Sequence, residues 1–348
     1  MSALPNSHEA LLRNRHRLTG RIGLLGVRDA RLLSHFEMPG LAFTDHAGVY
    51  ESIASVDGWL AAFGYDDGTL QAGSIDSVVV FLPKARAELD LRLTLALWLA
   101  APGALLMLIG EKKEGIAGAV KQLKALAPSA AKVDSARHCQ VWCADDVRPS
   151  ASFDLSDWLS WSRVSHRDTS VDVAGLPGVF SLGRLDEGTS LLLDSLMERP
   201  LHADRILDFA CGAGVIGSWL QVRQRDTGQA MTPVDGVDVQ SQALICARET
   251  YRRNGCEGVI EPSDGLTGIQ GAWDAIVTNP PFHTGIKTDT SMTERFLESV
   301  SNHLKPGGEL RLVANHFLPY EEPMKRHLTG VERVLESGRF TVYRAFRR

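Results

Sequence analysis

A short turn in the second half of the chain, Asn279-Pro280-Pro281-Phe282, carries residue types suited to holding a planar amine. It follows the apolar run 273–278, and two consecutive prolines cannot continue a central strand because each lacks the N–H that a sheet ladder needs. The side-chain oxygen of Asn279 and the backbone carbonyl of Pro280 could both accept N–H groups of one amine. The stiff turn would set this geometry in advance, and Phe282 offers a face on which a nucleic-acid base can stack.

Such a turn could make the amino group of a nucleobase more reactive. The lone pair of an exocyclic amine is delocalised into the ring, which makes the amine a poor nucleophile. Two acceptors on its N–H groups would direct the lone pair at an electrophilic carbon, as expected of preorganised polar contacts in an active site. The turn therefore indicates that a base amine acts as the nucleophile in a transfer reaction.

A glycine-rich turn, DFACGAG at 208–214, has the features of a nucleoside-binding loop. Gly212 and Gly214 let the backbone turn tightly and approach a ligand, and the helix expected after them directs its first N–H groups at that ligand. Asp238 ends the next strand, where its carboxylate could accept hydrogen bonds from both hydroxyls of a ribose. Asp264 follows the third strand and could receive an adenine amino group. Ligand-type residues at the ends of successive strands indicate a shared nucleoside crevice.

The loop sequence also favours one adenosine cofactor over another. Dinucleotide enzymes favour G-x-G-x-x-G, which admits a pyrophosphate, whereas Asp208 opens this loop with a carboxylate. A carboxylate repels a pyrophosphate but suits the ammonium and sulfonium charges of S-adenosylmethionine. S-adenosylmethionine is therefore the expected cofactor.

The second half alternates short apolar runs with amphipathic stretches, a pattern typical of a parallel sheet with helices on both faces. A final pair of apolar runs, 331–336 and 339–346, is joined by Ser337-Gly338 and predicts an antiparallel hairpin at the edge of that sheet. The other expected strands are 205–209, 234–239, 258–261, 273–278 and 309–314, and the expected helices are 215–223, 241–253 and 293–304.

The first half repeats this order in a weaker form. Residues 77–111 place a strand, a proline turn, a helix, a Pro-Gly turn and a strand in the order found at 274–315, which indicates an internal duplication. The first copy has FLPK at 81–84 where the second has NPPF at 279–282, and its segment 21–30 has no glycine-rich turn. We therefore expect the first copy to have the fold but no cofactor site.

The expected fold class is α/β, with two tandem Rossmann-like domains of methyltransferase type. The N-terminal domain, 1–160, is expected to be degenerate. The C-terminal domain, 161–348, is expected to be catalytic, with a mostly parallel seven-stranded sheet and an antiparallel edge hairpin. Residues 146–175 between the copies are polar and are expected to be irregular, with Trp158 and Trp161 as anchors.

Composition limits the remaining possibilities. The chain has 348 residues and five cysteines without paired short spacings, which favours buried thiols over a disulfide framework or a zinc site, so no metal is expected. No stretch suggests a leader or a membrane span, so we expect a cytoplasmic location. The net charge of −5 gives no general attraction to a polyanion, and nucleic-acid binding would need local basic patches. The candidates are Arg13, Arg15, Arg17 and Arg21 near the start, and Arg339, Arg344, Arg347 and Arg348 at the end.

Several longer segments give the chain a resemblance to a known family. They are 176–196, 207–217, 278–285, 307–320 and 336–346. In these segments the chain resembles the bacterial 16S rRNA guanine(1207)-N2 methyltransferases, the RsmC family. The resemblance implies methyl transfer from S-adenosylmethionine to the N2 amine of guanine 1207 in 16S rRNA, within the 30S subunit. It also implies an N-terminal methyltransferase-like domain that binds no cofactor. The missing glycine loop and the arginines near the N-terminus predict that this domain supports RNA binding, and a purely structural role, covering an apolar face of the active domain, is the alternative.

Carried over position by position, the resemblance gives roles to the residues above. Ala210 stands where many methyltransferases have a further glycine, a change that we expect to be tolerated. The implied cofactor-binding residues are Asp208, Ala210, Gly212, Gly214, Asp238, Asp264 and Asn279. The implied catalytic residues are Asn279, Pro280 and Phe282, and the expected substrate-binding residues are Phe282, His283, Arg13, Arg15 and Arg17.

Three other classes of protein share some of these features. Glutamine-N5 protein methyltransferases resemble the chain in an Asn-Pro-Pro-aromatic turn, but they usually have Tyr at the position of Phe282 and a helical N-terminal domain. The related 23S rRNA guanine-N2 enzymes differ in surfaces that the sequence does not reveal. An RNA-binding assembly factor with a vestigial cofactor site is disfavoured by the intact Asp208, Asp238 and Asn279.

Overall fold

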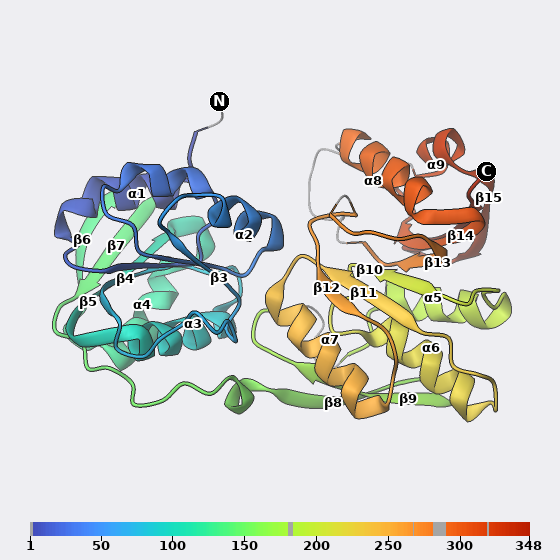
Figure 1. The fold of residues 1–348 in the computed structure, drawn as a ribbon, viewed down its shortest axis with the longest axis horizontal. Helices are drawn as coiled ribbons and strands as arrows, with labels where there is room; N and C mark the ends of the chain where they lie inside the picture. The colour runs from blue at the N-terminus through green and yellow to red at the C-terminus, as the bar shows by residue number, and fades with distance from the viewer. Residues whose placement is uncertain (1–2, 180–183, 267, 281–289, 319) are drawn as a thin grey trace. The chain divides into compact units, whose positions relative to one another are not determined.

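The computed structural model describes residues 3–179, 184–266, 268–280, 290–318 and 320–348, and of residues 290–292 only the backbone. The chain divides into two units, Met1–Leu159 and Ser160–Arg348, which Figure 1 draws from blue to green and from green to red. The sequence places this division at residue 160.

The N-terminal unit alternates strands and helices along its length. Its strands are β1 Ile22–Leu25, β2 Leu41–Thr44, β3 Leu60–Phe63, β4 Ile75–Phe81, β5 Ala100–Glu111, β6 Ala131–Ala136 and β7 Cys139–Ala144. Its α-helices are α1 Asn6–Asn14, α2 Ala47–Ala54, α3 Arg86–Leu99 and α4 Ile116–Leu126, and its 3-10 helices are η1 Arg15–Arg17, η2 Ala30–His35, η3 Lys112–Glu114 and η4 Leu155–Trp158.

The C-terminal unit begins with a hairpin and then repeats the same alternation. Its strands are β8 Ser160–His166, β9 Thr169–Gly175, β10 Ile206–Phe209, β11 Val234–Asp238, β12 Ile260–Pro262, β13 Trp273–Thr278, β14 Leu304–Asn315, β15 Thr329–Glu336 and β16 Phe340–Phe346. Its helices are α5 Glu187–Glu198, α6 Val215–Asp226, α7 Ser241–Asn254, α8 Thr290–His303 and α9 Glu321–His327.

Local sequence accounts for several element boundaries near the functional edge. Helix α5 begins after Asp186, whose side chain accepts a hydrogen bond from the N–H of Thr189 and so caps the first turn. Helix α6 starts after Gly214, which has a left-handed φ of 77°. Helix α7 ends before Gly255, which has a left-handed φ of 65°, as helix C-termini often require.

The two large sheets have the same strand order. The first runs β3-β2-β1-β4-β5-β7-β6 and the second β12-β11-β10-β13-β14-β16-β15. In each sheet the five leading strands pair in parallel, and the sixth, β7 or β16, is antiparallel to both of its neighbours. The prediction of two tandem Rossmann-like domains, the second with an antiparallel hairpin at its edge, is confirmed.

The likeness between the sheets extends to their irregularities. The pairing of β4 with β5 shifts register near the start of β4, and the pairing of β13 with β14 shifts at the corresponding place. Just before β1 the N–H of Arg21 donates to the carboxylate of Asp76, and just before β10 the N–H of Arg205 donates to Asp274. Shared irregularities of this kind support the internal duplication inferred from the sequence.

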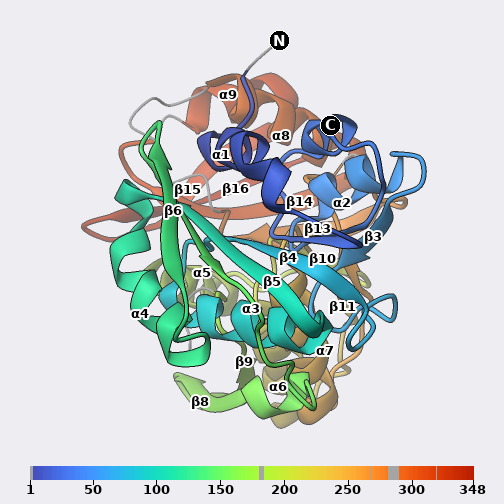
Figure 2. The same ribbon diagram turned by 90° about the vertical axis from the view of Figure 1, so that its left-hand side faces the viewer.

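Helices cover both faces of each sheet. In the N-terminal unit α1 and α2 lie on one side of the sheet and α3 and α4 on the other (Figure 2). In the C-terminal unit α5 and α6 pack on one face and α8 on the other. Neighbouring residues of a strand face opposite ways, so Ile206 packs with α5 and α6 while Leu207 packs with α8. Each sheet is therefore buried on both faces, and its strand ends are where polar groups can meet a ligand.

One sequence-based expectation was wrong. Residues 160–175 are not irregular but form the antiparallel pair β8–β9, in full register from Ser160 opposite Gly175 to His166 opposite Thr169. Its valines alternate with polar residues, and the buried ones, Val164 and Val171 among them, pack with α5 and α6. The segment looked irregular in the sequence because the polar residues on one face of the hairpin dominate its composition.

Candidate active site

The carboxyl ends of β10, β11, β12 and β13 meet at one edge of the second sheet, because neighbouring strands in this order run parallel. The hydroxyl of Thr278, the last residue of β13, donates to the carbonyl of Phe209, the last residue of β10, at 2.8 Å. The N–H of Ser263, just after β12, donates to the carbonyl of Asp238 at 2.9 Å. These bonds bring the residues that follow each strand into one row.

The glycine loop after β10 depends on residues with left-handed backbone. Ala210, Gly212 and Gly214 have φ values of 58°, 54° and 77°. Left-handed backbone is strained for a residue with a Cβ, so Ala210 occupies a position that glycine would fit more easily. A Cβ added at Gly212 would meet no atom within 4 Å, so open space lies beside the middle of the loop. Whether Ala210 contacts a cofactor stays a prediction.

Asp238, at the end of β11, connects the glycine loop to the turn that follows β11. One carboxylate oxygen accepts the N–H of Gly212 and the other accepts the N–H of Gln240, both at 2.9 Å. The N–H of Cys211 donates to the carbonyl of Val237 at 3.0 Å and adds a second link between loop and strand. Asp238 therefore fixes the loop, while its ribose role stays a prediction.

Asp208 precedes the loop and is fully buried. Among the described residues neither of its carboxyl oxygens has a hydrogen-bond partner. Burial raises the pKa of Asp208 to about 8; the backbone N–H of Gly217, which is near but makes no hydrogen bond, opposes the shift, and the nearby carboxylate of Asp238 adds to it. The sequence suggests an ionised carboxylate here, whereas this environment holds the group protonated near neutral pH. A buried, unpaired carboxyl group of this kind is typical of functional sites.

Asp264 lies one residue beyond Ser263 and is exposed. Since Ser263 is bonded to Asp238, the structure brings Asp264 to the same edge of the sheet as the ribose candidate. An exposed carboxylate at that point is able to receive the amino group of a base. Its adenine role stays a prediction.

Asn279 follows β13, and its side chain is held by the first turn of α5. Its Nδ2 donates to Oδ2 of Asp186 and to Oγ1 of Thr189, each at 2.9 Å. Pro280 beside it is buried. Sequence reasoning missed Asp186 and Thr189. The signal available was an Asp three residues before a Thr at a helix start, a capping pattern within segment 176–196.

Two candidate residues for the base, Phe282 and His283, lie outside the described residues. The basic residues near the N-terminus are described, and two of them are used within the chain. Arg13 pairs with Asp134 at 3.1 Å, and Arg15 donates to the carbonyl of His35 at 2.9 Å. The side chain of Arg17 is exposed and has no hydrogen bond or ion pair within the part of the chain that the structure describes.

The arginines near the C-terminus are all engaged within the C-terminal unit. Arg339 pairs with Glu187, and Arg344 pairs with Glu309 at 3.1 Å and with Glu332 at 3.2 Å. The last two donate to main-chain carbonyls, Arg347 to Leu304 and Arg348 to Lys325. These contacts make the C-terminal patch a weaker candidate for RNA than the sequence suggests.

The described residues contain no group of three or more His, Cys, Asp or Glu side chains arranged to hold a metal ion. Within the same residues, no helix has both the length and the apolar character needed to cross a membrane.

Two family models match the chain, one for each unit. Residues 170–344 match the family described as Methyltransferase small domain, and residues 8–161 match the family described as Methyltransferase small domain N-terminal.

Curated relatives match over the full length. The ribosomal RNA small subunit methyltransferase C of Hahella chejuensis is 40% identical over 356 aligned residues that cover 100% of both chains. The protein of the same name from Pseudomonas aeruginosa is 39% identical, with 97% of this chain and 98% of the relative covered.

One solved structure has the same fold across both units. It is the T. thermophilus 16S rRNA N2 G1207 methyltransferase (RsmC) in complex with AdoMet and guanosine. The TM-score is 0.84 at 23% sequence identity, covering 99% of this chain and 92% of that one. At this identity the likeness shows the fold.

Proposed function

The chain belongs to the ribosomal RNA small subunit methyltransferase C family, and on that premise we propose that it methylates the exocyclic N2 amine of guanine 1207 in 16S rRNA. The methyl donor is S-adenosylmethionine, and the RNA is met within the small ribosomal subunit, in the cytoplasm. The solved relative that was crystallised with AdoMet and guanosine supports the choice of donor and base.

The observation that carries the proposal is the position of Asn279-Pro280 at the carboxyl end of β13, beside the glycine loop after β10. Both Nδ2 hydrogens of Asn279 are used by Asp186 and Thr189. The side-chain oxygen of Asn279 is left as an acceptor, as methylation of a base amine requires. A protein that only bound RNA would gain nothing from this arrangement.

The residues at the edge fit the proposed donor. The positive charge of the donor would favour ionisation of the buried carboxyl group of Asp208, which could then compensate that charge, and the space beside Gly212 allows a ligand to approach the backbone. We assign Asp208, Gly212 and Gly214 to the methionine end, Asp238 to the ribose and Asp264 to the adenine. When bound, S-adenosylmethionine supplies an electrophilic methyl group on a sulfonium.

The chain's own residues then act on the amine. Oδ1 of Asn279 and the carbonyl of Pro280 accept its two N–H groups and direct the nitrogen lone pair at the methyl carbon. The nitrogen forms the new bond, the methyl–sulfur bond breaks with its electrons left on sulfur, and the amine releases one proton. A methylated base amine that keeps both protons is strongly acidic, so water can take that proton. Phe282, with His283 beside it, is assigned to stacking and holding the base.

We assign the N-terminal unit to RNA binding or support, without a cofactor of its own. Of Arg13, Arg15 and Arg17, only Arg17 has no side-chain partner among the described residues, so we take Arg17 as the main candidate for a phosphate contact. Phosphate contacts weaken with salt, with a slope of about 0.7–0.9 per contact. Replacing Arg17 by Ala should therefore flatten the salt dependence of RNA binding by about that amount. It should leave S-adenosylmethionine binding unchanged.

The proposed function is tested by supplying the protein with S-adenosylmethionine and one of three RNAs that lack the modification. The RNAs are free 16S RNA, assembled 30S subunits and 23S RNA. N2-methylguanosine at position 1207 of 16S rRNA is the expected product, and comparison of the first two substrates shows which form is used. Methylation of 23S RNA alone would favour the 23S enzymes, and methylation of a protein glutamine would favour the glutamine-N5 class.

A further inference from the structure

We propose that Asp186 and Thr189, on the first turn of α5, are positioning residues that fix the side-chain amide of Asn279 with its oxygen towards the substrate amine. The proposal rests on the proposed function and adds two residues to it. These residues touch neither substrate nor cofactor in this role. They act through Asn279.

The hydrogen bonds of Asn279 define which way its amide faces. An ionised carboxylate has no hydrogen to donate, so the atom 2.9 Å from Oδ2 of Asp186 must be the amide nitrogen. The second amide hydrogen is used by Oγ1 of Thr189, also at 2.9 Å. The reversed amide would place its oxygen against the carboxylate and repel it. The orientation that leaves Oδ1 open to the substrate is therefore the stable one.

Asp186 and Thr189 are themselves held in place. Oδ2 of Asp186 also accepts the N–H of Thr189 at 3.1 Å, so one carboxylate caps the helix and orients the catalytic amide. This bond joins the two acceptors into one unit. The first turn of α5 thus presents a preorganised pair of acceptors to Asn279.

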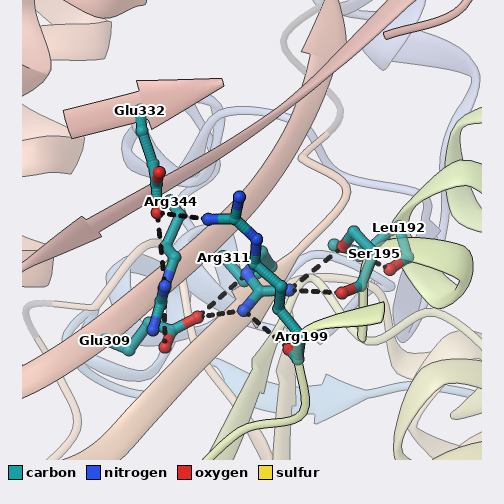
Figure 3. Close-up of polar contacts among 7 residues, drawn as sticks. All are labelled: Leu192, Ser195, Arg199, Glu309, Arg311, Glu332 and Arg344. Atoms are coloured by element: carbon teal, nitrogen blue, oxygen red, sulfur yellow. Dashed lines mark hydrogen bonds and ion pairs between the residues drawn. The ribbon is translucent and has the colours of Figure 1, made fainter. Parts of the chain in front are cut away.

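The other end of α5 is fastened by a buried arginine of the same sheet (Figure 3). The guanidinium of Arg311 donates through Nη1 to the carbonyl of Ser195 at 2.9 Å and through Nη2 to the carbonyl of Arg199 at 3.0 Å. Arg311 is fully buried, and its charge is balanced by Glu309, two residues earlier on β14. Figure 3 shows that Arg344 joins Glu309 to Glu332 and so ties the network to β15 and β16.

This arrangement gives α5 a fixed position relative to the strand that carries Asn279. Strand β14, which holds Arg311, pairs in parallel with β13, and Leu312 lies opposite Thr278. The helix is therefore fastened one strand away from the residue that its first turn orients.

The test replaces the acceptors one at a time and measures single-turnover methylation at saturating S-adenosylmethionine. Thr189→Val keeps the shape of the side chain but removes Oγ1, and the rate should fall roughly 2- to 10-fold. Asp186→Ala removes a charged acceptor, and the rate should fall roughly 10- to 100-fold. Thr189→Ser restores an acceptor and should recover most of the rate. Cofactor affinity should be near wild type in each variant.

Ser190→Ala is the matched control for the helix. Ser190 follows Thr189, but its hydroxyl faces Nδ1 of His166 at 3.3 Å instead of Asn279. Its removal should leave the rate unchanged. If Ser190→Ala slows methylation as much as Thr189→Val does, the effect is general to α5 and the positioning role is wrong.

A double-mutant cycle separates positioning from a general structural role. If Thr189 acts only through Asn279, Thr189→Val should cause no further loss of rate in an Asn279→Ala background. If the double variant loses rate by the product of the two single-variant losses, the two residues act independently and the proposal is overturned.

A readout without RNA keeps this proposal distinct from the proposed function. In protein labelled with 15N-asparagine, both side-chain amide protons of Asn279 should give NMR signals typical of hydrogen-bonded protons, and Thr189→Val should shift one of them. This holds whichever RNA is the substrate. Amide signals that Thr189→Val leaves unchanged would contradict the orientation even if the methylation product is as proposed.

Discussion

The two large sheets share strand order and register but differ at the residues that end their central strands. Strand β1 pairs with β2 and β4 in the same register in which β10 pairs with β11 and β13. Three positions assigned to cofactor and substrate in the second sheet carry residues without those functions in the first. Asp208, Asp238 and Asn279 correspond to Leu24, Thr44 and Phe81, all three of them buried.

The carboxyl edge of the first sheet is occupied by two guanidinium groups of the chain itself. Arg92 donates to the carbonyl of Phe81 at 3.0 Å, and Arg28 donates to the carbonyl of Leu82 at 2.7 Å. In register, Leu82 corresponds to Pro280, whose carbonyl is proposed to accept the substrate amine. The first sheet therefore satisfies internally a backbone acceptor whose counterpart in the second sheet is proposed to bind the substrate.

The loops after β1 and β10 separate the residues that the fold requires from those that the site requires. Gly26 in the first unit and Ala210 in the second hold equivalent positions, and both have left-handed φ, 88° and 58°. The fold thus requires this turn in both units. Gly212, in contrast, corresponds to Arg28, whose guanidinium fills the edge. On our proposal, a few side chains separate the sheet that binds the cofactor from the sheet that does not.

The largest expected effect concerns Arg92, whose guanidinium lies at the carboxyl edge of the first sheet. Arg92 is buried and pairs with Glu88 and Asp45, so Arg92→Met would leave the buried carboxylate of Glu88 uncompensated. Loss of one partner of a buried pair costs about 3–5 kcal/mol, measurable by urea unfolding. S-adenosylmethionine affinity should not change. Arg31→Met, at an exposed pair with Asp29, is the control and should matter far less. A second cofactor site in Arg92→Met would refute the expectation that this unit has lost its site.

The next effect concerns the catalytic amide. Asn279→Ala should lower the methylation rate by about 10²–10³, the size typical of one preorganised polar contact. Cofactor affinity should remain near wild type. Asn279→Phe, which introduces the residue of the first sheet, should be no more active. Near-normal turnover of either variant would rule out the proposed mechanism.

A third effect follows from the buried carboxyl group of Asp208. Its pKa in the folded protein is about 8, above the ordinary value of 3.8, so the folded chain holds a proton that the unfolded chain releases between these values. The contribution of Asp208 to the free energy of unfolding is fully present below pH 3.8. It is lost as the pH rises towards 8, by up to ~1.4 kcal/mol per pH unit. Urea unfolding at about pH 6, 7 and 8 should show this slope in the wild type. Asp208→Leu, which introduces the residue that the first sheet has as Leu24, should lack it, and parallel curves would contradict the assignment.

A smaller effect is expected for the ribose contact. Asp238→Ala should weaken S-adenosylmethionine binding by roughly tenfold to several hundredfold, because two charge-assisted hydrogen bonds are lost. Part of the loss will come from the bond between Asp238 and Gly212. A cofactor analogue without ribose hydroxyls separates the two contributions. The affinity of this analogue should differ much less between the wild type and Asp238→Ala than the affinity of S-adenosylmethionine does. If both ligands lose the same affinity in the variant, the ribose contact lies elsewhere.

The smallest effect concerns the shared left-handed turn. Ala210→Gly should relieve backbone strain and raise the free energy of unfolding by up to ~1 kcal/mol. The reverse change in the first unit, Gly26→Ala, should destabilise more strongly. A Cβ at Gly26 would lie 2.1 Å from Nη1 of Arg92, and the φ of 88° is unfavourable as well. Thermal unfolding of both variants checks the pair, and a less stable Ala210→Gly would contradict the strain argument.

Much of the fold could be predicted from the sequence, because parallel strands buried on both faces leave continuous apolar runs. The polar residues at or beside the ends of those runs, Asp208, Asp238 and Asn279, stood out for the same reason. Their common edge then followed from the βα alternation alone. The hairpin at 160–175 was missed because each of its short strands shows only a weak alternation.

The rest depends on contacts between segments that are distant in the sequence. Nothing local in the sequence shows that Asp186 and Thr189 reach Asn279, or that Arg28 and Arg92 bind the carbonyls after β4. The same holds for Arg13, whose partner Asp134 lies 121 residues away. A sequence pattern indicates which groups are present, but packing decides which of them have partners.

Hydrogen exchange with and without S-adenosylmethionine tests most directly the claim that one sheet binds the cofactor and its duplicate does not. Saturating cofactor should slow exchange in peptides that contain the glycine loop, 209–214, and the end of β11 near Asp238. Peptides that contain Gly26 or Phe81 should exchange at the same rate in both samples. Slowed exchange around Gly26 and Phe81, or no change in the glycine loop, would contradict the account.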